Sequence, residues 1–205
     1  MKDSTITPIF CTPIFKSEMN RKFNKKESDF FKKHKGKIYF NAGNSKSKNN
    51  YLLNEPDLKD IKKFILRKIS DYIENVVCPA EKIEPYITQS WLAVTENNQH
   101  HHTHSHPNSY ISGVLYVNAR EKEDCIVFVN KKYEQLKVYP KDWNIFNAEN
   151  WWVPVKTGDL ILFPSDVEHK VNIKETKSTR ISLSFNVFIK GFLGNNQSLT
   201  GLELK

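Results

Sequence analysis

Apolar and polar residues alternate along most of the chain after Pro79. Eight short segments have this alternation or a short apolar run, and turn residues separate them: 90–95, 101–106, 109–118, 124–129, 150–155, 159–163, 169–173 and 180–189. Alternation places successive side chains on opposite faces of a strand. Eight short strands without intervening helices predict a β-sandwich or barrel.

Before these strands, the spacing of apolar residues predicts one amphipathic helix. Apolar side chains recur every three or four positions, at Leu58, Ile61, Ile65, Ile69, Tyr72 and Val76. Asn54 is expected to cap this helix and Pro56 to lie in its first turn. The apolar stripe should pack against a sheet. Helices first and strands afterwards indicate an α+β fold.

The chain is expected to form one domain with four parts. Residues 1–50 are a basic lead-in with an edge strand near "TPIFCTPIF", 51–79 hold the helix, 80–190 hold the β core, and 191–205 are a glycine-containing tail. The lead-in carries 12 Lys+Arg and 4 Asp+Glu, so it accounts for the whole net charge of +8. We interpret it as a solvated surface, and nucleic acid would bind only through this segment.

The cysteines and the hydropathy indicate in which cellular compartment the protein is expected. Cys11, Cys78 and Cys125 form no CxxC pair, so we expect reduced thiols that are buried as small apolar side chains. No apolar run is long enough to span a membrane, and the start of the chain lacks the layout of a secretory signal. These features predict a cytoplasmic protein.

Five of the seven histidines lie within "HHHTHSH", at 100–106. On a strand, His102, His104 and His106 would share one face. Either His102 with His104 or His104 with His106 has the spacing of a metal-binding pair, and Pro107 favours the second pair. His169 begins a later strand and is the expected third ligand.

A second polar group occurs in the last long strand. Alternation in "RISLSFN" puts Arg180 and Ser182 on one face, with Ser184 and Asn186. An unpaired arginine is costly in a core. The face is therefore expected to line a cavity that receives an anion, because guanidinium binds carboxylates through two hydrogen bonds.

Three stretches in this order carry a resemblance to a known family. They are "HSHPNSYISGVLYV" (104–117), "PVKTGDLILFPSDVEHKV" (154–171) and "RISLSFN" (180–186), and "SW" (90–91) and the early "TPIF" add to them. Together they resemble a family of 2-oxoglutarate/iron oxygenases within the Fe(II)/2-oxoglutarate-dependent oxygenase superfamily.

The resemblance implies both a fold and a site. The fold would be a double-stranded β-helix, a cupin-like jelly-roll, with the N-terminal helices packed outside. Fe(II) would be held by His104, His106 and His169. The cosubstrate 2-oxoglutarate would be held by Arg180 and Ser182, and the Tyr116 hydroxyl would add to them. The implied reaction is a dioxygenase reaction, with hydroxylation as its default outcome, on a small molecule or peptide with O2.

His106 departs from the superfamily, which usually has Asp or Glu two residues after the first histidine. A neutral imidazole leaves the site one unit more positive, and this favours an anionic cosubstrate. Three-histidine iron sites occur in cupin-type dioxygenases, so a dioxygenase that does not use 2-oxoglutarate is one alternative. The other is a non-catalytic metal-binding jelly-roll that serves as an interaction module.

Two further groups of residues receive structural interpretations. Trp143, Trp151 and Trp152 are expected in core packing or at the rim. Glu121, Glu123 and Asp124 are expected in a solvated turn, not as ligands. Edge strands of a jelly-roll are able to pair, so an oligomer is compatible with the sequence. The sequence does not identify the substrate.

Overall fold

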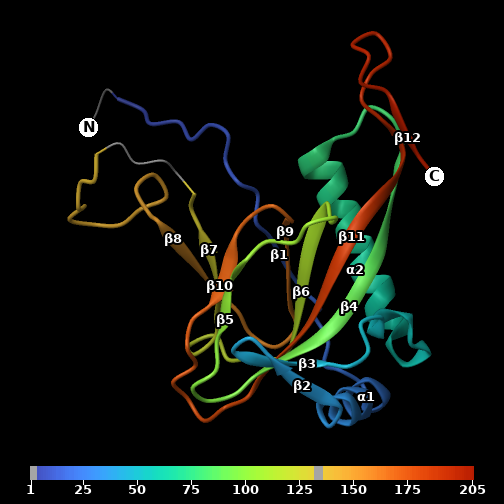
Figure 1. Cartoon of the computed structure of the whole chain (residues 1–205), viewed down its shortest axis with the longest axis vertical. Coiled ribbons are helices and arrows are strands. Elements are labelled where there is room, and N and C mark those ends of the chain that lie inside the picture. The colour runs from blue at the N-terminus through green and yellow to red at the C-terminus, as the bar shows by residue number, and fades with distance from the viewer. Residues whose placement is uncertain (1–3, 132–135) are drawn as a thin grey trace.

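The computed structural model describes residues 4–131 and 136–205. In this part of the chain, twelve strands form two antiparallel sheets (Figure 1). The eight-stranded major sheet contains β1 (Phe15–Glu18), β2 (Ile38–Asn41), β3 (Asn44–Ser47), β4 (Ile83–Thr95), β6 (Ile111–Asn118), β9 (Asp159–Pro164), β11 (Arg180–Leu193) and β12 (Leu202–Leu204). The four-stranded minor sheet contains β5 (His101–His104), β7 (Cys125–Val129), β8 (Asn150–Pro154) and β10 (His169–Val171).

The two sheets have the strand order of a jelly-roll. Along the major sheet it runs β1-β9-β6-β11-β4-β3-β2, with β12 beside β11, and along the minor sheet β5-β10-β7-β8. All eight strands predicted after Pro79 are present; β4 begins seven residues before the predicted start, and the other ends differ by at most four residues. The predicted double-stranded β-helix is confirmed.

Alternating side chains of the major sheet divide between two hydrophobic clusters. Leu160 and Leu162 of β9 pack with the helix on the outer face, whereas Ile161 and Phe163 pack toward the minor sheet. Leu183 and Phe185 of β11 belong to the outer cluster. Period-two alternation therefore turns Arg180 and Ser182 toward the minor sheet, as predicted.

Helix α2 (Lys59–Tyr72) covers the outer face of the major sheet (Figure 1). Its predicted apolar stripe is fully buried at Leu58, Ile61, Ile65 and Ile69. Two short 3₁₀ turns (Leu52–Asn54 and Pro56–Leu58) precede the helix, and a π turn (Ile73–Val77) follows it.

Two details of the predicted helix were wrong. Asn54 does not cap α2, because the 3₁₀ turns separate it from the helix start. Leu58 occupies the N-cap position instead and makes no side-chain hydrogen bond there. The Asn54 side chain instead accepts a hydrogen bond from Lys62. The wider π turn shifts the phase of the apolar stripe, which leaves Val76 exposed.

The first 50 residues contribute more than the one edge strand that was expected. β1 pairs with β9 at one edge of the major sheet, while the β2–β3 hairpin pairs with β4 at the other. Between them lies α1 (Lys25–Lys35), which begins with a capping box of Asn24 and Glu27. The repeated TPIF segment lies mostly before β1 and outside regular structure.

Two smaller expectations also have an outcome. Cys11 and Cys78 are exposed and Cys125 is half-buried, so the prediction of buried thiols was wrong. None of the helices in the described residues is both long and apolar enough to cross a membrane.

Candidate metal centre

Three histidines converge at one end of the space between the sheets. His104, at the end of β5, lies directly opposite His169, at the start of β10. His106 follows β5 in a loop, and its backbone N–H donates to the Ser165 carbonyl at 2.9 Å. One ring nitrogen from each of the three histidines lies within 4.8 Å of the other two. This spacing suits three imidazoles around one metal ion.

Backbone carbonyls orient two of these rings. Nδ1 of His104 lies 2.8 Å from the His102 carbonyl oxygen, and Nδ1 of His169 lies 3.1 Å from the Val167 carbonyl oxygen. A carbonyl only accepts, so each Nδ1 carries the proton and donates. The lone pair for a metal is then on Nε2 of both rings.

Burial keeps the three imidazoles neutral, which is the form that binds metals. Burial lowers the pKa of His169 to about 3 and that of His106 to about 4, and the neighbouring His104 adds to both effects. It also lowers the pKa of His104. In the described residues, no carboxylate belongs to the cluster. A divalent transition metal therefore fits this donor set, with imidazoles as its only protein ligands.

A second group, His101, His102 and His104, satisfies the same distance criterion. A β-bulge places His101 opposite Val171, so the simple two-residue spacing expected for 102, 104 and 106 does not describe this strand. Both His101 and His102 come from the same short strand as His104, and His102 is exposed. The first group is favoured because it includes His169, which is only 6% exposed and whose ring packs against that of Phe163.

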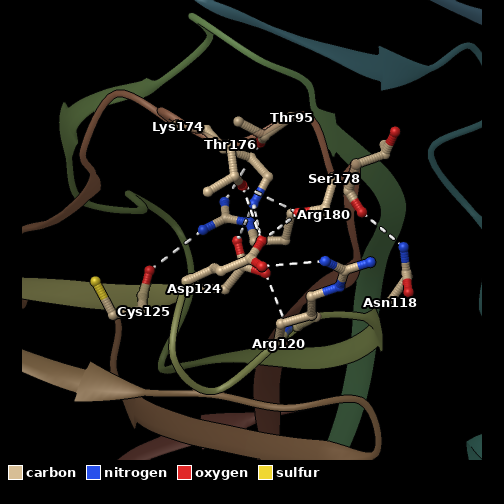
Figure 2. A network of polar contacts seen from close by, with 12 residues as sticks. Thr95, Asn118, Arg120, Asp124, Cys125, Lys174, Thr176, Ser178 and Arg180 are labelled. Carbon is tan, nitrogen blue, oxygen red and sulfur yellow. Dashed lines mark hydrogen bonds and ion pairs between the residues drawn. The ribbon is translucent and has the colours of Figure 1, made fainter.

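Arg180 is buried in the same interior and has no ion pair with a carboxylate among residues 4–131 and 136–205. Its side chain is 4% exposed, Nη1 donates to the Cys125 carbonyl at 3.2 Å, and Nη2 lies 3.5 Å from the Thr95 hydroxyl (Figure 2). Nε has no hydrogen-bond partner within the described residues. A buried cation with an orphaned donor is suited to bind an anion.

Two hydroxyls lie on the same face of the major sheet. Ser182 and Tyr116 are directly opposite each other on β11 and β6, and both are buried. Burial raises the pKa of Tyr116, while the charge of Arg180 lowers it. The phenol therefore remains a neutral donor close to the guanidinium. Burial, followed by the neighbouring His104, lowers the pKa of His101 to about 2, and the charge of Arg180 adds to this effect.

A polar network of charged residues and hydroxyls lies beside Arg180 (Figure 2). Lys174 Nζ lies 2.8 Å from Asp124 Oδ1 and 3.8 Å from Glu123 Oε2. Glu123 also accepts hydrogen bonds from Ser178 and Thr176, which with Arg120 lower its pKa to about 2. Asp124 is buried, so the prediction of a solvated turn was wrong for this residue, whereas Glu121 is exposed.

Of the two positions expected for three tryptophans, the core and the rim, their exposure contradicts only the core. Trp143, Trp151 and Trp152 are 57%, 45% and 52% exposed. Trp151 and Trp152 lie on β8, which is the outermost strand of the minor sheet. A strand at the edge of a sheet leaves its side chains uncovered on one flank.

Comparisons with known proteins find one family model and several solved structures of similar fold. Residues 89–186 match the family model described as "Putative 2OG-Fe(II) oxygenase". No curated protein matches the chain.

Solved structures share the fold at low sequence identity. HygX from Streptomyces hygroscopicus, with nickel and 2-oxoglutarate bound, has a TM-score of 0.59 and 11% identity, over 86% of this chain and 82% of that chain. The α-ketoglutarate-dependent epimerase SnoN from nogalamycin biosynthesis has a TM-score of 0.58 and 12% identity, over 86% and 78%. A Pseudomonas putida prolyl-4-hydroxylase has a TM-score of 0.54 and 12% identity, over 85% and 92%.

The matched segment is the one that contains the clustered histidines, Tyr116, Arg180 and Ser182. Over residues 89–186, the chain is similar to the 2OG-Fe(II) oxygenase family, and the match is consistent with an oxidoreductase that uses iron and 2-oxoglutarate.

Proposed function

We propose that this chain is an active oxygenase that hydroxylates a C–H bond of a small molecule or peptide, with Fe(II) held by His104, His106 and His169. The observation that carries this proposal is the buried guanidinium of Arg180, whose Nε lacks a hydrogen-bond partner among the described residues. An interior cation without an acidic partner is costly unless an anion completes it. A dicarboxylate that also reaches the histidines meets this need.

The three imidazoles would bind the metal through neutral nitrogens. A carboxylate ligand would cancel one unit of the ion's charge, and three imidazoles cancel none. The full double charge of Fe(II) would then attract the keto-acid end of 2-oxoglutarate more strongly than a 2-His-1-carboxylate site does. His106 in place of Asp or Glu is thus compatible with use of this cosubstrate.

Arg180, Ser182 and Tyr116 would hold the far carboxylate of 2-oxoglutarate. The guanidinium offers its unpartnered Nε–H, and the hydroxyl-bearing residues Ser182 and Tyr116 are buried opposite each other on the same face. Tyr116 stays protonated, because burial raises its pKa, and so it donates. Together these groups would fix the length and direction of the cosubstrate.

The protein's part in the reaction is to bind, to orient and to exclude water. The ring of Phe163 makes an edge-to-face contact with that of His169 at a centroid distance of 4.7 Å. The ring of Phe128 lies next to both. These apolar side chains keep bulk water away from the histidine nitrogens. When bound, iron and 2-oxoglutarate supply O2-dependent oxidation, coupled to decarboxylation of 2-oxoglutarate to succinate and CO2.

The test is an anaerobic titration with Fe(II) and then 2-oxoglutarate, followed by the visible metal-to-ligand charge-transfer band. The band should form with the wild type, weaken strongly with Arg180→Ala and vanish with His169→Ala and His106→Ala. His102→Ala is the matched control, because this exposed histidine belongs only to the second group. It should leave the band unchanged.

Other outcomes would contradict the proposal in distinct ways. Fe(II) binding without a band would favour the cupin-type dioxygenase that does not use 2-oxoglutarate. Loss of the band in His102→Ala but not in His106→Ala would move the metal to the second group of histidines. No metal binding at all would favour the non-catalytic interaction module.

A further inference from the structure

Four residues form one row across the minor sheet. His104 lies opposite His169, His169 opposite Phe128, and Phe128 opposite Trp151. Residues directly opposite each other in antiparallel strands project from the same face. Trp151 therefore shares a face with two of the clustered histidines. At a strand spacing of about 4.8 Å, its backbone lies about 10 Å from that of His169.

This face is the interior of the fold. Val153 follows Trp151 by two residues and packs against the cluster that contains Phe128 and Tyr116. Phe128 is only 7% exposed and contacts Phe163. Trp151 is 45% exposed because β8 is the last strand of the minor sheet within the described residues. Trp151 is thus an accessible indole at the rim of the space that holds the histidines.

The proposed cosubstrate site would extend in another direction. Arg180 reaches the minor sheet at the Cys125 carbonyl, three residues before Phe128 on β7. Three residues of strand correspond to about 10 Å along the strand axis. Relative to His169 and Phe128, Arg180 is therefore displaced along the strand direction. Trp151 is displaced at right angles to it, across the strands. The indole stays free when 2-oxoglutarate spans the histidines and Arg180.

Two ion pairs lie at this rim within the described residues. Glu168, which precedes His169, is paired with Lys131 at 2.8 Å, and Glu149, which precedes β8, is paired with Lys137 at 2.7 Å. Neither pair adds a net charge, so recognition would rely on the apolar surfaces of Trp151 and Phe128.

We propose that Trp151 determines substrate specificity by stacking on a planar, uncharged aromatic group of the primary substrate. This inference rests on the proposed function. An indole held by an edge strand offers a rigid π face at little entropic cost, and Phe128 forms an apolar floor beside it. The aromatic group belongs either to an amino-acid side chain or to a nucleobase, because both offer the same planar surface.

The experiment labels the four tryptophans with 5-fluorotryptophan and follows their ¹⁹F resonances. Single Trp→Phe variants assign the resonances. The full chain is loaded with 2-oxoglutarate and either diamagnetic Zn(II) or paramagnetic Co(II), so no turnover is needed. Co(II) should broaden the resonances of Trp91, whose ring is 6.0 Å from that of His106, and of Trp151. Trp152 is 52% exposed on the opposite face of the same strand and is the matched control.

Probes are then added to the Zn(II) form: N-acetyl-phenylalaninamide, adenosine and the aliphatic N-acetyl-leucinamide. At least one planar probe should shift the Trp151 resonance, while the aliphatic probe and the Trp152 resonance should show no effect. The planar probe that acts identifies an aromatic side chain or a nucleobase as the source. Trp151→Ala should weaken binding of that probe about tenfold. Trp152→Ala should not weaken it.

The contrary outcomes separate this inference from the proposed function. Broadening of Trp91 without Trp151 would leave the metal site intact and overturn the inference. A Trp151 resonance that responds to Co(II) but to neither planar probe would overturn it as well. If Co(II) broadens no resonance, including that of Trp91, the proposed metal site itself fails.

Discussion

The ammonium of Lys174 and the carboxylate of Asp124 form an ion pair of 2.8 Å in which the two side chains are 3% and 4% exposed. The backbone of Lys174 is hydrogen-bonded to Asn98 and Gln99, just before β5. Asp124 immediately precedes Cys125, whose carbonyl accepts from Arg180. One buried pair therefore ties the approach to the histidine strand to the start of β7, where the Cys125 carbonyl accepts from Arg180.

Replacing one member of this pair should be strongly destabilising. Asp124→Asn leaves the Lys174 ammonium buried without its counter-charge, and such changes typically cost about 3–5 kcal/mol. Urea unfolding should show this loss, and the dissociation constant for 2-oxoglutarate should rise because Arg180 loses its support. Glu121→Gln, at an exposed position of the same turn, is the control and should leave both unchanged. An equally stable Asp124→Asn protein would refute the structural role of the pair.

Restoring a carboxylate ligand should weaken cosubstrate binding. His106→Asp creates the usual 2-His-1-carboxylate set and lowers the net charge of the metal site by one unit. We expect metal binding to persist and the dissociation constant of 2-oxoglutarate to rise on the order of tenfold, because the metal attracts the anion less. Anaerobic titration of the charge-transfer band measures this constant. Tighter cosubstrate binding in the variant would contradict the charge argument.

Gly113 should tolerate no side chain, because the buried ring of Phe185 packs across its Cα. The two residues are directly opposite on β6 and β11, and a Cβ at Gly113 would overlap the Phe185 ring. Gly113→Ala should lower the free energy of unfolding by about 1–3 kcal/mol through overpacking. Combining it with Phe185→Leu should cost less than the sum of the two single changes, as measured by urea unfolding. Strict additivity would argue against the contact.

Acid should weaken the start of α1 through Glu27. Burial favours its protonated form, but bidentate hydrogen bonds from Arg21 and one from the Asn24 backbone outweigh this and lower the pKa of Glu27. The stabilisation is therefore complete above the unfolded pKa of about 4.3 and is lost as the pH falls through the lower folded value.

At neutral pH, Glu27→Gln should cost about 1.5–3 kcal/mol, the typical value for hydrogen bonds to a charged group. The difference from the wild type should shrink below about pH 4, because both proteins then carry an uncharged side chain there. Thermal or urea unfolding across this range measures it. Asp29→Asn, at an exposed pair with Lys25 on the same helix, should have no measurable effect.

Much of the interior could be predicted from the sequence because strand alternation is local. Apolar residues at every second position of β9 and β11 identify the two faces, and the polar face of β11 is the one that carries Arg180. Helix α1 was not predicted, although Asn24 and Glu27 have the spacing of a capping box. Its many lysines concealed the apolar pair Phe30 and Phe31, which is buried.

Other features depend on partners far away in the chain. Asp124 is buried only because Lys174, fifty residues later, neutralises it. The bulge in β5 places His101 opposite Val171, and no property of the histidine-rich stretch indicates this register. Trp151 is exposed because β8 ends the minor sheet, which is a property of the strand order. Local patterns carry no information of these kinds.

The N-terminal fifty residues border the major sheet on both sides, through β1 at one edge and the β2–β3 hairpin at the other. They cover backbone groups that would otherwise be free to pair with another chain. A shortened protein limited to residues 89–186 would therefore expose two open edges and lose the first half of β4. The segment that contains the candidate site is therefore not a portable unit, because a region outside it covers both edges of its sheet.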